Sequence, residues 1–239
     1  GTRLDDLHGL LNGIDTAVWN PATDQSLPAR YSADDPIGKA KCRAKLLKTF
    51  GWSTTFKGPL CGMVCRFTPA KGLDLVLGAK EFFAKENCQL VVLGGGEKKY
   101  EDLLQEFATA HPARVGLCVR LDEAMSHLVE AGSDFFLMPS LFEPCGLNQM
   151  YSQAYGTVPL VSNVGGLVDT VTDVDAHPET GTGIMFAPKQ EEFDAGLKRA
   201  LALFADQARY AAVQHRAMQQ DFSWTRAVAG YEQLYTEAL

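Results

Sequence analysis

Apolar residues in this chain follow two alternating spacings from residue 58 onward. Short runs rich in β-branched residues indicate strands, and each run is followed by a longer stretch with apolar residues at helical spacing. The runs predict strands at residues 60–64, 89–93, 115–119, 135–138 and 159–162. The longer stretches predict helices near residues 73–83, 100–107, 124–131 and 147–155, and three closing helices at 190–204, 207–221 and 224–239, the last with Ser223 as its N-cap.

Five strand–helix repeats predict successive right-handed crossovers within one parallel sheet, which is the doubly wound, Rossmann-like α/β fold. The strands are apolar almost throughout, as is typical when helices cover both faces of a sheet. We expect residues 58–189 to form this domain and residues 190–239 to pack on it as C-terminal helices. Residues 1–57 are rich in turn signals and predict an irregular N-terminal segment with one helix at 39–50.

Composition narrows the class of protein. The chain has 239 residues, 46% of them hydrophobic and 21% charged, which excludes intrinsic disorder. Lys and Arg number 22 against 29 Asp and Glu, and the resulting net charge of −7 argues against a general nucleic-acid binder.

The longest apolar runs fall far short of the ~18 residues that span a bilayer, so we expect no membrane segment. The first residues resemble neither a secretory signal nor a transit peptide, and we expect a chain that begins within a longer protein.

Cysteine and histidine spacing gives no sign of a metal site. The six cysteines form no C-x-x-C pair, and the five histidines show neither metal-ligand nor catalytic-triad spacing. We therefore expect no metal, no hydrolase triad, and free thiols in a reducing compartment.

Two cations follow the first expected strand. Arg66 and Lys71 bracket a turn that leads into a helix, and at the carboxyl edge of a parallel sheet such a pair can clamp phosphate oxygens. The alternative is that both are solvated surface charges. Gly94 begins a three-glycine run after the second strand, where the backbone can approach a ligand closely. The run does not complete a dinucleotide fingerprint, so a nicotinamide dinucleotide is not expected.

A carboxylate and a small-residue helix start follow the fourth strand. Glu143 can accept hydrogen bonds from hydroxyls, and the free amides that open the next helix can bind an anion. The alternative is that Glu143 only caps that helix. Gly165 and Gly166 form another close-approach loop after the fifth strand.

These segments together resemble a known family. The motifs are LNGID at 11–15, WNP at 19–21, RFTPAKG at 66–72, DFF at 134–136, EPCGLNQ at 143–149, YGT at 155–157 and GGL at 165–167. In this order they are similar to the C-terminal half of bacterial glycogen synthases and plant starch synthases. The resemblance implies half of a GT-B type, retaining glucosyltransferase that uses ADP-glucose, or UDP-glucose, to extend an α-1,4-glucan without a metal or cofactor.

The resemblance also implies roles for particular residues. Arg66 and Lys71 would hold the donor diphosphate, and Glu143 would hold the transferred glucose. Further contacts to sugar and phosphates are expected from Cys145, Gly146, Leu147, Asn148, Gly94, Gly165 and Gly166. Leu121 stands where the family usually has an aromatic residue that stacks on the base of the donor nucleotide. A leucine at this position affects which base the site prefers.

The family's N-terminal acceptor domain has no counterpart in these residues, so we expect the isolated chain to transfer little or no glucose. The last helix carries Trp224, Tyr231, Leu234 and Tyr235 and is expected to expose an apolar patch toward that domain. A bacterial parent would work in the cytoplasm, and a plant or algal one in the plastid stroma. Two alternatives stay open, a nucleotide-sugar epimerase and a non-catalytic nucleotide- or glucan-binding module.

Overall fold

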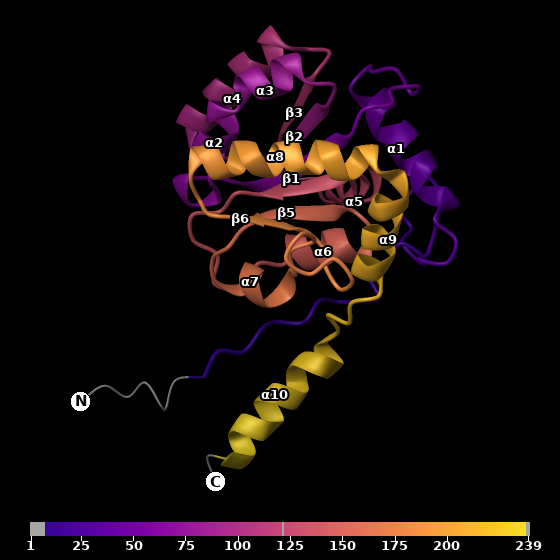
Figure 1. Ribbon diagram of the computed structural model, residues 1–239, viewed down its shortest axis with the longest axis vertical. Coiled ribbons are helices and arrows are strands. Elements are labelled where there is room, and N and C mark those ends of the chain that lie inside the picture. The colour runs from indigo at the N-terminus through magenta and orange to yellow at the C-terminus, as the bar shows by residue number, and fades with distance from the viewer. Residues whose placement is uncertain (1–7, 121, 238–239) are drawn as a thin grey trace, which may run out of the picture.

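A computed structural model describes residues 8–120 and 122–237 of the chain. Its centre is a parallel sheet of six strands in the order β3-β2-β1-β4-β5-β6 (Figure 1). The strands are β1 (Leu60–Phe67), β2 (Gln89–Gly96), β3 (Val115–Val119), β4 (Phe135–Met138), β5 (Val158–Ser162) and β6 (Ile184–Phe186). The order reverses between β1 and β4, so the predicted doubly wound fold is confirmed.

Helices cover both faces of the sheet (Figure 1). Alternate residues of β2 enter two separate cores, because successive side chains of a strand point to opposite faces. Leu90 and Val92 face one core and Val91 and Leu93 the other. The helices are α1 (Ile37–Thr49), α2 (Leu73–Gly78), α3 (Lys80–Lys85), α4 (Lys98–Ala110), α5 (Glu123–Gly132), α6 (Asn148–Ala154), α7 (Gly166–Thr170), α8 (Gln190–Ala205), α9 (Gln207–Met218) and α10 (Trp224–Glu237), with a 3-10 turn, η2 (Pro69–Lys71), before α2.

The structure differs from the predicted elements in several places. The helix expected at 73–83 is divided into α2 and α3, where the Gln190 side chain packs against Gly78 and donates to the Leu75 carbonyl at 3.2 Å. The short elements β6 and α7 were not predicted, because three and five residues are too few to show a periodicity. Strands β1 and β2 also continue three residues further than predicted, through Phe67 and Gly96, so Arg66 and the three glycines lie within strands instead of after them.

A buried lysine fastens the N-terminal segment to the sheet domain. Lys39 on α1 donates from Nζ to the carbonyls of Ala131 and Tyr155, both at 3.0 Å, and to the Thr157 hydroxyl at 2.7 Å. The two carbonyls lie at the ends of α5 and α6, where helix carbonyls lack partners within the helix. Burial lowers the pKa of Lys39 to about 8. The segment before β1 is thus bound to the fold by specific polar contacts.

The expectation that residues 190–239 pack on the sheet domain is confirmed for α8 and α9, which have buried residues, but not for α10. Helix α10 has no buried residue, and Figure 1 shows it extending away from the sheet. Ser223 Oγ accepts a hydrogen bond from the Arg226 amide at 3.4 Å, which confirms Ser223 as the predicted N-cap. Of the four residues predicted for the apolar patch, Trp224 and Tyr235 are 45% and 68% exposed, whereas Tyr231 and Leu234 are half-buried. Val228, which was not predicted, is 43% exposed. None of the helices in residues 8–120 and 122–237 has the length and apolar character needed to cross a bilayer.

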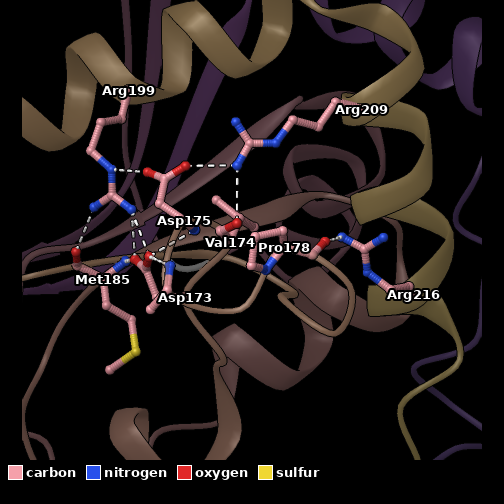
Figure 2. A network of polar contacts seen from close by, with 9 residues as sticks. Asp173, Val174, Asp175, Pro178, Met185, Arg199, Arg209 and Arg216 are labelled. Atoms are coloured by element: carbon pink, nitrogen blue, oxygen red, sulfur yellow. Dashed lines mark hydrogen bonds and ion pairs between the residues drawn. The ribbon is translucent and has the colours of Figure 1, made fainter.

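An ion-pair network ties the loop before β6 to helices α8 and α9 (Figure 2). Arg199 donates to both carboxylate oxygens of Asp173, at 2.7 and 2.8 Å, and to Asp175 at 2.6 Å. Burial alone would raise the pKa of Asp173, but hydrogen bonds from Arg199 and from backbone amides outweigh it and hold the pKa below its usual 3.8. Arg209 joins the network through Asp175 at 2.6 Å.

Replacing Arg199 with leucine is expected to lower the free energy of unfolding at pH 7 by about 2 kcal/mol, because Asp173 loses its charged hydrogen bonds. A carboxyl group whose pKa is lower in the folded chain than in the unfolded chain stabilises the fold at pH values above its unfolded-state pKa. That stabilisation is lost as the pH falls through the folded-state pKa. The variant should therefore lose less stability than the wild type below pH 3.8, the usual value for Asp173. Urea unfolding at pH 7 and below pH 3.8 measures both effects.

Arg209→Leu is the matched control for that experiment, because the Arg209–Asp175 pair is much more exposed, at 41% and 47%. Its effect should be clearly smaller. Equal losses from the two variants would contradict the role assigned to Arg199.

Candidate functional site

The loops that follow β1 and β4 meet because these two strands are neighbours at the centre of the sheet. Cys61 pairs with Phe135 and Gly62 with Phe136, so both strands deliver their carboxyl ends to one edge. This is the point where strand order reverses, which is where ligands bind in sheets of this type. The sheet topology therefore places the two predicted motifs side by side.

A glycine allows the two loops to touch. Gly72 has φ +68°, and a Cβ there would lie only 1.7 Å from the Pro139 carbonyl oxygen. Next to this contact, the Leu141 amide donates to the Ala70 carbonyl at 2.8 Å. The turn that carries Lys71 is thus fixed directly against the loop that leads to Glu143.

A cavity of about 190 Å³ lies between the loops. It brings together six of the residues predicted from the sequence, from two separate motifs. Its lining is Met63, Val64, Cys65, Arg66, Lys71, Leu137, Met138, Ser140, Glu143, Gly146, Leu147 and Asn148.

Lys71 and Glu143 form an ion pair in this cavity. Lys71 Nζ lies 2.5 Å from Glu143 Oε2, and the two side chains are 22% and 9% exposed. Ser140 Oγ donates to the same carboxylate oxygen at 3.1 Å. The alternative that Lys71 is merely a solvated surface charge does not fit this partly buried contact.

Arg66 lies near the end of β1, and its side chain is exposed at the cavity. Within residues 8–120 and 122–237 it forms no side-chain hydrogen bond or ion pair. A guanidinium in this position can donate two parallel hydrogen bonds to a phosphate. Among the residues that the structure describes, Arg66 is thus an unpaired cation of the cavity and Lys71 a paired one.

The start of α6 forms the opposite wall. Gly146 has φ +74°, and Asn148 Nδ2 donates to the Val64 carbonyl at 2.8 Å, which joins this wall to β1. Gln149 Nε2 donates to the carbonyls of Cys145 and Gly146, at 3.1 Å each. Gln149, to which the sequence-based prediction gave no role, therefore helps to set the conformation of residues 145–148.

Gly165 and Gly166 lie behind this wall and support it. A Cβ on Gly165 would be 2.0 Å from the Glu143 carbonyl oxygen, and the Gly166 amide donates to that oxygen at 3.1 Å. A Cβ on Gly166 would meet the Cys145 carbonyl oxygen at 2.4 Å. The close approach predicted for these glycines is thus made to the protein's own backbone, and ligand contacts from Cys145, Gly165 and Gly166 stay predictions.

A second cavity, of about 490 Å³, adjoins the first and shares Val64, Cys65 and Asn148 with it. Gly94 lies in this second cavity, at the end of β2. Leu121 is outside the described residues, although Arg120 and Asp122 on either side of it line the cavity. The remaining lining residues are Trp19, Leu93, Glu123 and Ser126.

Trp19 brings the N-terminal segment to this second cavity. Its ring is stacked between His127, with centroids 3.9 Å apart, and Tyr151, at 3.8 Å. Asp24 supports the stack by accepting hydrogen bonds from His127 Nδ1 at 2.7 Å and the Tyr155 hydroxyl at 2.5 Å. Since both ring faces are occupied, Trp19 can offer only its edge to a ligand. No local sequence signal marks this cluster, because its members are far apart in the chain.

Two observations limit the chemistry of the site. Burial raises the pKa of the Cys65 thiol to about 12, so this cysteine stays protonated near pH 7 and is a poor nucleophile. In the described part of the chain, no three His, Cys, Asp or Glu side chains are grouped so that they could hold a metal ion. Among the described residues, the charged side chains that line the first cavity are Arg66, Lys71 and Glu143.

Comparisons with known proteins agree with this arrangement. Residues 53–214 match the family model for glycosyl transferases group 1. The glycogen synthase of Opitutus terrae is 59% identical over 238 residues, which cover 100% of this chain and 50% of that protein. The glycogen synthase of Paracidovorax citrulli is 46% identical over 238 residues, covering 99% of this chain and 47% of that protein.

Solved structures show the same fold. The catalytic domain of starch synthase IV from Arabidopsis thaliana, bound to ADP and acarbose, superposes with a TM-score of 0.88 at 36% identity, over 95% of this chain and 48% of that one. The lipopolysaccharide glycosyltransferase WaaG, at 18% identity and a TM-score of 0.68 over 98% of this chain and 57% of its own, shares the fold alone. The chain spans about half the length of the curated relatives it matches. It belongs to the glycosyl transferases group 1 family, and throughout its length it is similar to one half of a glycogen synthase.

Proposed function

We propose that this chain is the nucleotide-sugar-binding half of a glycogen or starch synthase, which transfers glucose from ADP-glucose to the non-reducing end of an α-1,4-glucan with retention. The observation that carries the proposal is the cavity at the point where the strand order of the sheet reverses, because Arg66, Lys71 and Glu143 converge there. The chain that forms this cavity is 59% identical to a protein named glycogen synthase. The epimerase alternative gains no support from the comparisons.

The charges of the cavity suit this reaction. Breaking the bond between glucose and the diphosphate builds negative charge on the leaving phosphate and positive charge on the sugar ring. Arg66 and Lys71 would stabilise the negative charge on the leaving phosphate, and the Glu143 carboxylate would accept hydrogen bonds from sugar hydroxyls. Fixed groups of this kind favour the transition state over the ground state, and one such donor is worth about 3 kcal/mol in other enzymes. The reaction as proposed needs no metal.

The remaining partners are proposed from the relatives. The starch synthase IV structure carries ADP and acarbose, which supports ADP-glucose over UDP-glucose as donor and a glucan as acceptor. The other half of the relatives' length would supply the acceptor domain, and the exposed apolar residues of α10 fit a contact with it. The named glycogen synthases are bacterial, which favours the cytoplasm among the two expected locations.

Calorimetric titration with ADP tests the proposal. We expect the wild-type chain to bind ADP, and Arg66→Ala to weaken binding about tenfold through the loss of a charge-assisted hydrogen bond to phosphate. Lys57→Ala is the matched control, because this exposed lysine precedes the opposite end of the same strand. Both variants remove one surface cation, so a general charge effect would weaken binding equally in the two. That result, or a wild-type chain that does not bind ADP, would contradict the proposed site.

A further inference from the structure

The two carboxylate oxygens of Glu143 have different surroundings. Oε2 accepts from Lys71 Nζ at 2.5 Å and from Ser140 Oγ at 3.1 Å. Oε1 accepts no hydrogen bond from any residue in the described ranges, and it is not one of the fully enclosed unpaired oxygens. Since Glu143 lines the cavity, one oxygen is held by the protein and the other is left for a ligand.

Ser140 is well placed to hold the first oxygen. It is only 2% exposed and follows β4 by two residues. The residues on both sides of it are fixed, Pro139 by its packing against Gly72 and Leu141 by its hydrogen bond to Ala70. The backbone around Ser140 therefore leaves its hydroxyl little freedom to move away from Glu143.

Lys71 is less suited to hold Glu143 alone during the reaction. A bound diphosphate attracts the same ammonium group, so the lysine would be shared between phosphate and carboxylate. The neutral Ser140 hydroxyl is much less attracted to the phosphate and can stay on Oε2. The backbone of Glu143 is fixed independently, by the Gly166 amide at 3.1 Å.

We propose that Ser140 is a positioning residue for sugar recognition: its hydroxyl holds Oε2 of Glu143 so that Oε1 faces the glucose of the bound nucleotide sugar. This inference rests on the proposed function. It goes further by naming a residue that acts on the sugar through Glu143 and leaves the nucleotide contacts unchanged.

The test compares the affinities of the whole chain for ADP and for ADP-glucose by calorimetry. The ratio of the two dissociation constants isolates the contribution of the glucose. We expect Ser140→Ala to leave ADP affinity unchanged and to lower the preference for ADP-glucose by about fivefold, since one hydrogen bond to a charged group is lost. Ser140→Thr keeps a hydroxyl and should restore the preference.

Ser162→Ala is the matched control, because Ser162 is also fully buried, stands at the end of β5, and has a hydroxyl without a hydrogen-bond partner. It should change neither affinity. Unchanged ADP binding by Ser140→Ala also shows that the variant is folded.

Three outcomes would overturn the inference. If Ser140→Ala prefers ADP-glucose as strongly as the wild type does, Ser140 does not position Glu143, and the proposed function stands. If Ser140→Thr behaves like Ser140→Ala, the hydroxyl is not the active group. If the wild-type chain itself binds ADP-glucose no more tightly than ADP, the role proposed for Glu143 fails and this inference fails with it.

Discussion

Replacing Lys71 with methionine is expected to weaken the binding of ADP about 100-fold, which corresponds to about 2.7 kcal/mol. Lys71 ends the η2 turn, and its ammonium group already lies in a partly buried site beside Glu143. A charge that is shielded from solvent binds phosphate more strongly than an exposed one. Calorimetric titration of the variant and the wild type with ADP measures the effect.

The same substitution should also destabilise the chain without ligand, by about 2 kcal/mol, because it leaves the Glu143 carboxylate without its cation. Adding Glu143→Gln should restore most of that loss, since no unpaired charge is then left in the cavity. Urea unfolding of the wild type, the two single variants and the double variant gives the free energies of unfolding for a double-mutant cycle. A Lys71→Met variant as stable as the wild type would show that the ion pair contributes nothing.

Lys85→Met is the control for both measurements. Lys85 is also paired with a carboxylate, Glu81 at 2.7 Å, but the pair lies on an exposed helix face, with side chains 74% and 80% exposed. We expect neither ADP binding nor stability to change measurably. If Lys85→Met weakened ADP binding as much as Lys71→Met, the effect would not come from the cavity.

Gly165→Ala is expected to lower the free energy of unfolding by about 3 kcal/mol, the sum of backbone strain and overpacking. Gly165 has φ +49° and ψ −137°, and a methyl group there would lie 2.0 Å from the Glu143 carbonyl oxygen. The loop must shift, and the hydrogen bond from the Gly166 amide to Glu143 must lengthen. We therefore also expect the preference for ADP-glucose over ADP to decrease. Urea unfolding and calorimetry measure the two effects.

Gly51→Ala is the control that separates the effect of backbone strain at Gly165 from the effect of its contact with Glu143. Gly51 has φ +71° but no atom within 4 Å of an added Cβ, so the substitution introduces only backbone strain. We expect a loss of about 1 kcal/mol. Equal losses at the two positions would mean that the contact with Glu143 is easily relieved, and that Gly165 does not support the site.

The main features of the fold could be predicted because they rest on local patterns. Five of the six strands are apolar runs, since helices cover both faces of the sheet and bury most of the strand side chains, and this is readable from the sequence. The convergence of Arg66, Lys71 and Glu143 was predictable for a similar reason, because the carboxyl ends of neighbouring parallel strands share one edge.

Contacts between distant residues could not be predicted in this way. Ser140 is one of many serines, and only the folded chain brings its hydroxyl to Glu143. The stack of Trp19 with His127 and Tyr151 joins three separate segments. The break between α2 and α3 likewise depends on Gln190, which lies far along the chain. A single sequence holds no periodic signal for such pairs.

The short pairing between β1 and β4 at the centre of the sheet affects how easily the two halves of the sheet separate. β1 is joined to β2 by eight register pairs but to β4 by only two, so the two halves of the sheet meet at a short seam. Lys71 lies on one side of this seam and Glu143 on the other. A ligand held by both loops would bridge the halves and oppose local opening between them. Hydrogen exchange of the β1 and β4 amides would then slow when the cavity is filled.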